Sequence, residues 1–170
     1  MSYRDTLEAA KAKGQQEADA FNAAYPVGTR VIAYPSVRPE FDAERAAQTR
    51  LVTTTRTPAW ILGHGTPLVS VHGYSGGIVL EHVDIDHDSP LGDGEILAHT
   101  LTPENLNRFD DWIDMLGIYA KGYWETVDGK LAVTGLRIGT GPDRVVAKFG
   151  DTIIRHEDGH FSVRQAVTAS

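Results

Sequence analysis

The chain has 170 residues, of which 41% are hydrophobic and 23% are charged, with a net charge of −7 and no cysteine. This composition is typical of folded globular proteins and excludes intrinsic disorder as the main state. Without cysteine the protein has no disulfide framework, no thiolate zinc site and no cysteine nucleophile.

Acidic residues are concentrated in the second half of the chain. Residues 1–83 carry eight Lys/Arg and eight Asp/Glu, whereas residues 84–170 carry eight and fifteen. Because phosphate backbones are bound mainly by clustered Lys and Arg, we do not expect a nucleic-acid partner. No segment approaches the roughly 20 apolar residues of a membrane span, and the first residues contain no apolar signal region. We therefore expect a cytoplasmic protein without a membrane partner.

The first expected element is a helical arm, residues 1–25, with the helix itself over residues 3–24. Ser2 and Asp5 have the spacing of a capping box. A narrow apolar stripe follows at spacings of three and four: Tyr3, Leu7, Ala10, Gly14, Ala18, Phe21 and Tyr25. The stripe could pair with a second copy as a homo-oligomer contact, or it could lie on its own barrel. Gly14 weakens the helix as a free-standing coiled coil.

Residues 26–83 are expected to form a small, five-stranded SH3-like barrel. Pro26 ends the helix, and short strands with turn signals between them follow at residues 28–34, 51–56, 59–62, 68–71 and 77–83. The longest expected loop, residues 36–49, contains Arg38, and long loops are where small barrels often place their binding residues.

Residues 84–94 have the composition of an acidic interdomain linker, and residues 95–170 are expected to form a separate α+β module. Its pattern is a strand at 95–100, a helix at 103–116 with Thr102 as N-cap, and two strands around the turn Val127–Lys130. Further strands are expected at 144–148, at 152–155 and, after a turn at 157–159, at 161–163. The predicted fold class is α+β with antiparallel strands.

Three runs, residues 21–29 (FNAAYPVGT), 56–63 (RTPAWILG) and 71–78 (VHGYSGGI), resemble a small module of uncharacterised actinobacterial and actinobacteriophage proteins, over residues 21–83. The ending at residues 147–155 (AKFGDTIIR) and 158–161 (DGHF) is similar to the close of many small phage proteins, where Pro stands in place of Phe149. The resemblance implies a phage or prophage accessory protein in the host cytoplasm, and it carries no activity or site residues.

The favoured function is a non-enzymatic interaction module that binds a host or phage protein, since no complete catalytic set is found. Aromatic and Arg side chains are typical interface anchors, and the candidates are Arg56, Trp60, Tyr74 and Trp124. An alternative is a small-ligand binder that sequesters a nucleotide-type defence signal of the host. Arg38, Arg50 and Arg56 would then bind phosphate and Tyr74 would stack on the base.

A second alternative is a function that requires a bound metal ion. Asp84, Asp86, Asp88 and Glu95 have the spacing of calcium-loop positions 1, 3, 5 and 12. Ser89 stands where the loop needs glycine and Pro90 follows, so an acidic linker is favoured over a calcium site. The same segment, from His82 to Asp88, offers imidazole and carboxylate groups for a metal-dependent hydrolase.

Overall fold

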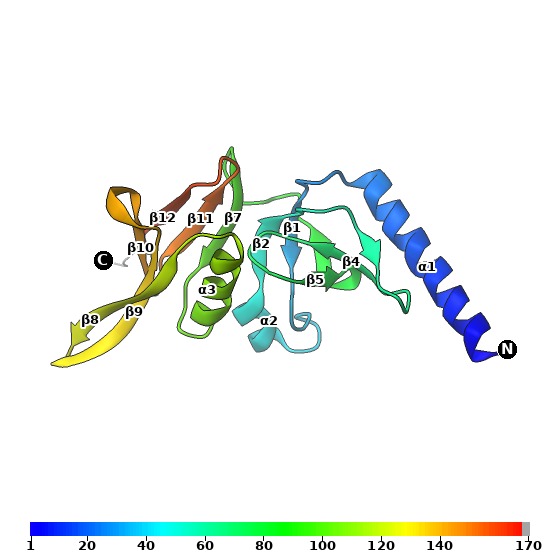
Figure 1. Cartoon of the computed structure of the whole chain (residues 1–170), viewed down its shortest axis with the longest axis horizontal. Helices are drawn as coiled ribbons and strands as arrows, with labels where there is room; N and C mark the ends of the chain where they lie inside the picture. The colour runs from blue at the N-terminus through cyan, green and yellow to red at the C-terminus, as the bar shows by residue number, and fades with distance from the viewer. Residues whose placement is uncertain (168–170) are drawn as a thin grey trace. The chain divides into compact units, whose positions relative to one another are not determined.

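The computed structural model describes residues 1–167, which form helices and antiparallel sheets in an α+β fold (Figure 1). The chain divides into two compact units, Met1–Ser89 and Pro90–Ser170. No helix in the described part combines the length and the apolar character that crossing a membrane requires.

Helix α1 (Tyr3–Ala24) confirms the expected helical arm and its capping box. The Ser2 hydroxyl accepts a hydrogen bond from the amide of Asp5 at 3.2 Å, and the Asp5 carboxylate accepts one from the amide of Ser2 at 3.0 Å. The apolar stripe packs against strands β3 and β4 of the same unit, where Gly14 and Ala18 are buried. The part of the stripe that is buried therefore contacts its own chain.

Two features attach α1 to the first unit. A Cβ atom on Gly14 would lie 1.7 Å from the carbonyl oxygen of Gly65, so only glycine allows this close approach between the helix and the β3–β4 turn. One helical turn after the buried Ala18, the Asn22 side chain bonds the backbone of Ala59 in both directions, at 2.7 and 3.0 Å. Ala18 joins a small core with Ala59 and Val69.

Within the first unit the strands fall into two antiparallel groups of three. In one sheet β1 (Arg30–Ala33) lies between β2 (Leu51–Thr54) and β6 (Val83–Ile85). The other consists of β3 (Trp60–Ile61), β4 (Pro67–Ser70) and β5 (Gly77–Val79). A single bridge, Thr55 to Val71, joins them, and no closed barrel is found among residues 1–89.

Two local expectations for this unit are corrected. The expected strand at residues 77–83 is interrupted by the 3-10 turn η1 (Leu80–His82), after which β6 includes the first two residues of the expected linker. The expected loop at residues 36–49 contains helix α2 (Ala43–Thr49), whose N-cap Asp42 accepts a hydrogen bond from the amide of Arg45 at 3.0 Å. A good cap and two consecutive alanines are enough for two helical turns inside a long connection.

Among residues 90–167 the strands also fall into two antiparallel groups of three. Strand β11 (Thr152–His156) lies between β7 (Glu95–Thr100) and β12 (Phe161–Arg164). Strand β9 (Lys130–Ile138) lies between β8 (Ala120–Val127) and β10 (Val145–Lys148), with the turn η2 (Gly141–Asp143) before β10. Figure 1 shows the tip of the β8–β9 hairpin extending away from the other strands of this unit.

Helix α3 (Leu106–Met115) contributes the aromatic core of the second unit. Phe109 and Trp112 are buried and meet edge to face at 5.3 Å, and Trp112 meets Phe161 in the same way at 5.9 Å. The N-cap is Asn105 rather than the expected Thr102. Thr102 and Asn105 instead bond each other in a turn just before the helix, with distances of 2.9 and 3.3 Å.

Candidate functional site

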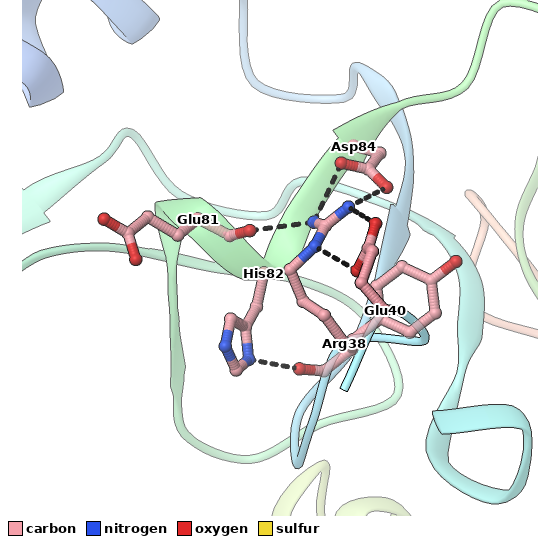
Figure 2. A network of polar contacts seen from close by, with 6 residues as sticks. Arg38, Glu40, Glu81, His82 and Asp84 are labelled. Atoms are coloured by element: carbon pink, nitrogen blue, oxygen red, sulfur yellow. Dashed lines mark hydrogen bonds and ion pairs between the residues drawn. The ribbon is translucent and has the colours of Figure 1, made fainter. Parts of the chain in front are cut away.

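A polar network of the first unit surrounds Arg38, in the loop after β1 (Figure 2). Its guanidinium donates two hydrogen bonds to the carboxylate of Glu40, at 3.0 and 3.1 Å, and two to the carboxylate of Asp84, at 2.9 and 3.0 Å. A fifth bond, of 2.8 Å, goes to the backbone carbonyl of Glu81 in η1. A guanidinium has five N–H donors, so every donor of Arg38 is used within the chain.

The loop and η1 are connected by a second pair of bonds. The amide of Tyr34 donates to the carbonyl of His82 at 2.9 Å, and Nδ1 of His82 lies 3.0 Å from the carbonyl of Tyr34. Arg38 also lies over the Tyr34 ring, with Cζ 5.5 Å from the ring centroid.

Hydrogen bonds from Arg38 lower the pKa of Glu40, and the Asp84 and Glu40 carboxylates raise the pKa of Arg38. We call Arg38, Glu40, Asp84 and the Glu81 carbonyl the Arg38 network; it fixes the backbone of η1.

A groove of about 320 Å³ lies between α1, the β3–β4 turn and η1. Its charged side chains are Lys13 and Glu17 from the helix and Glu81 from η1, and His64 adds an imidazole. Lys13 and Glu17 form an exposed ion pair at 3.7 Å. The remaining lining is mostly small or aliphatic: Ala10, Gly14, Gly65, Thr66, Pro67, Val79 and Leu80. We call this site the α1 groove.

The Arg38 network and the α1 groove share Glu81. The carbonyl of Glu81 is held by Arg38, while its carboxylate points away from the guanidinium (Figure 2). The side chain of Glu81 is exposed and lines the groove. The network therefore holds the backbone from which one groove carboxylate projects.

Three of the predicted binding residues of the first unit have roles inside the unit. Arg56 donates to the carbonyls of Val71 and Ser75, at 3.1 and 3.3 Å, and burial lowers its pKa. Trp60 covers Gly77, where a Cβ atom would lie 2.8 Å from the indole, and 37% of Trp60 remains exposed. Tyr74 is half-buried beside Gly76.

Two predicted binding residues are exposed. Arg50 is the C-cap residue of α2. Trp124 lies on β8 in the second unit and is 53% exposed. The nucleotide hypothesis remains a prediction, and of its three arginines Arg38 has no free donor while Arg56 is engaged with backbone carbonyls.

The predicted metal ligands belong to different parts of the chain. Asp84 is on β6 and binds Arg38, whereas Glu95 begins β7 in the second unit and accepts hydrogen bonds from the Gly92 amide at 2.8 Å and from Arg164 at 3.1 Å. Within residues 1–167, no three His, Cys, Asp or Glu side chains are grouped so that they could hold a metal ion. The hydrolase hypothesis depends on His82 and Asp84. In the structure Asp84 accepts hydrogen bonds from Arg38, and the His82 ring bonds the carbonyl of Tyr34.

Sequence reasoning missed a half-buried histidine in the second unit. The amide nitrogen of Asn105 donates to the carbonyl of Thr100 at 2.9 Å, and it lies 3.0 Å from Nε2 of His99. Because the amide nitrogen is a donor, Nε2 must be the acceptor and the ring proton sits on Nδ1. Burial, with a smaller contribution from Arg108, lowers the pKa of His99 to about 4. His99 stacks on Phe109 at 5.4 Å.

Comparison with protein-family models, with curated proteins and with solved structures finds no significant match for this chain.

Proposed function

We propose that the protein is an accessory protein of phage or prophage type that acts as a non-enzymatic interaction module, and that the α1 groove of the first unit receives a Lys or Arg side chain of a protein partner. The observation that carries this proposal is a groove of about 320 Å³ whose wall presents the carboxylate of Glu81 from a backbone fixed by Arg38.

The charges of the groove favour a cation. Its lining contains one Lys and two Glu, and Lys13 is paired with Glu17. Glu81 is then the carboxylate that offers a charge-assisted hydrogen bond to an incoming ammonium or guanidinium group. The methylene stem of a Lys or Arg would lie against Pro67 and Leu80, since long cationic side chains bury their stems on apolar surface.

The walls are also held in place before a partner binds. Gly14 and Gly65 are in direct backbone contact on one side, and Arg38 holds η1 on the other. A preformed site loses less conformational entropy on binding, which supports recognition of a single side chain.

We also propose that the first unit is SH3-like. If β2 and β3 are taken as one strand bent at residues 55–59, the unit has five strands, and the last strand, β6, returns to pair with β1. The bridge from Thr55 to Val71 connects the two sheets at the bend. Helix α1 supplies Ala18 and Phe21 to a core that also contains Val69 of β4.

The test is an NMR titration of the ¹⁵N-labelled chain with blocked tripeptides Gly-Lys-Gly, Gly-Arg-Gly and Gly-Glu-Gly. We expect saturable shifts of the amides of Gly14, Gly65 and Leu80 with the two cationic peptides and none with the acidic one. Glu81→Gln should weaken this binding about tenfold, because the charge-assisted bond is lost. The control Glu104→Gln makes the same charge change at an exposed residue of the second unit and should leave binding unchanged.

Equal shifts with all three peptides, or shifts that Glu81→Gln does not reduce, would contradict the proposal. Absence of saturable shifts in the groove amides at peptide concentrations of several millimolar would do the same.

A further inference from the structure

We propose that strand β8 pairs antiparallel with β8 of a second copy of the chain, about a two-fold axis that passes through Tyr123. This inference goes beyond the proposed function, because every residue it uses lies in the second unit. It also differs from the expected association through the N-terminal helix, whose stripe is partly buried within the first unit.

Strand β8 is an edge strand. The order of its sheet is β10-β9-β8, so one side of β8 pairs with β9 and the other has no neighbouring strand among residues 90–167. The strand is eight residues long and carries exposed apolar side chains, with Trp124 53% and Val127 45% exposed. A long edge with apolar side chains is a template for pairing with another strand.

The hairpin turn determines which backbone groups of β8 point outward. Asp128 and Gly129 both have positive φ, of 50° and 77°, as a two-residue turn requires. Val127 and Lys130 flank this turn and are therefore a hydrogen-bonded pair, so the backbone groups of Val127 point toward β9. Because direction alternates along a strand, residues 125, 123 and 121 also point toward β9, and residues 126, 124, 122 and 120 point outward.

The irregularity in this hairpin does not change that alternation. Tyr123 and Trp124 are consecutive, but their partners Gly135 and Val133 are separated by Thr134. The extra residue of the bulge is therefore on β9, and β8 stays regular.

The outward residues restrict the registers in which two copies of β8 can pair. Each outward residue must face another outward residue, so the two-fold axis must pass through a residue and not between two residues. With the axis at Tyr123, Gly122 pairs with Trp124 of the second copy, and Lys121 faces Glu125 of the second copy. Both pairs occur twice by symmetry. Axes at Gly122 or Trp124 would place no Lys opposite a Glu.

The charges fit this register closely. Lys121 and Glu125 would lie in non-hydrogen-bonded pairs, where facing side chains are nearest. Glu125 is already oriented by Thr134 at 2.5 Å and Lys148 at 2.9 Å, and each carboxylate oxygen keeps a further lone pair for Lys121 of the second copy. Lys121 is exposed.

The opposite face of β8 would bury its tryptophan. The indole of Trp124 lies over Gly122 of its own strand, 3.7 Å from where a Cβ atom would stand. In the paired strands, each Trp124 would face the Gly122 of the second copy, so the two indoles would come together above two residues without side chains. Aromatic side chains that cover glycine in neighbouring strands stabilise a sheet.

Single cysteines test the register directly, because the chain has no cysteine of its own. In a non-hydrogen-bonded antiparallel pair the facing Cα atoms are about 4.5 Å apart, within the range of a disulfide. Tyr123→Cys should therefore give a disulfide-linked dimer on mild oxidation. In Lys121→Cys and in Glu125→Cys, the cysteine of one copy would be far from the same cysteine in the second copy. These two variants should remain largely unlinked. Equal linking at all three positions, or none at 123, would overturn the proposed register.

Sedimentation equilibrium of the cysteine-free chain provides the independent measurement. We expect a reversible dimer, and Lys121→Glu should raise its dissociation constant about tenfold or more, because two attractive pairs become repulsive. Lys130→Glu is the matched control, since it changes the same charge on the same hairpin at β9, and it should leave the constant unchanged. A chain that stays monomeric up to about 0.5 mM, or equal effects of the two variants, would overturn the proposal.

Discussion

At the scale of single residues, Arg38 shows how a predicted binding residue can instead hold the backbone of a site. Its side chain is only 20% exposed, whereas its carboxylate partners are 47% and 60% exposed. Arg38→Ala should destabilise the first unit by about 1–2 kcal/mol, a range set by hydrogen bonds to charged groups and reduced for the solvent exposure of the partners. Urea unfolding measures this change.

Arg38→Lys is the informative companion variant. A lysine keeps the charge but lacks the planar fork that bonds two carboxylates and a carbonyl at once, so it should recover less than half of the lost stability. The same variant should weaken binding of Gly-Lys-Gly to the α1 groove, because η1 is no longer fixed. Full recovery of stability by lysine would show that the charge alone, and not the geometry, supports this loop.

His99 makes the stability of the second unit depend on pH. Its pKa is lowered to about 4 in the fold and returns to about 6.5 in the unfolded chain. Between these values the unfolded state binds more protons, so the free energy of unfolding rises with pH. The contribution is fully present above pH 6.5 and is lost as pH falls toward 4, with a total on the order of 3 kcal/mol.

His99→Gln separates this contribution from the titration of carboxylates, because glutamine keeps an acceptor for Asn105 and does not titrate near neutral pH. We expect the variant to lose stability less steeply between pH 6.5 and 4 than the wild type, as measured by hydrogen exchange of the amides in α3. An NMR titration of the His99 ring should give a pKa well below 6.5, and identical pH slopes for the two chains would refute the argument.

At the scale of elements, the contact between α1 and the β3–β4 turn depends on glycine. Gly14→Ala would raise intrinsic helix propensity by about 1 kcal/mol, yet its Cβ atom would overlap the carbonyl of Gly65. We expect net destabilisation of the first unit and faster hydrogen exchange in α1. Gly63→Ala is the control, because nothing lies within 4 Å of its Cβ position and its backbone is not strained. A stabilised Gly14→Ala chain would show that the helix does not pack here.

The elements with local signals could be predicted from sequence. The capping box placed α1, the Asp128-Gly129 turn placed the β8–β9 hairpin, and the strand expected at residues 95–100 coincides with β7. Helix α2 was missed because it has only seven residues inside a charged loop, and η1 was missed because it depends on contacts with other parts of the unit, such as the bonds that connect it with the loop after β1.

The candidate site was predicted less well than the fold. The pattern around Arg38 showed a charged loop, but its partner Asp84 is 46 residues away, and no local periodicity reports such a pairing. The α1 groove also joins three separate segments, at residues 10–17, 64–67 and 79–81. One signal is present in the sequence: Gly14 in the centre of an otherwise regular stripe is typical of close packing as well as of a weak helix.

At the scale of the whole molecule, the two units should fold separately. The division falls between Ser89 and Pro90, and each unit has its own buried apolar residues, such as Val31 and Val69 in the first and Phe109 and Trp112 in the second. We expect residues 1–89 and 90–170, expressed as separate chains, to give dispersed ¹⁵N–¹H spectra that overlay the spectrum of the full chain away from the junction. Peptide binding should remain with the first fragment and dimerisation with the second. A fragment that is unfolded alone would instead make the 170 residues one cooperative unit, and both proposals would then have to be tested only in the full chain.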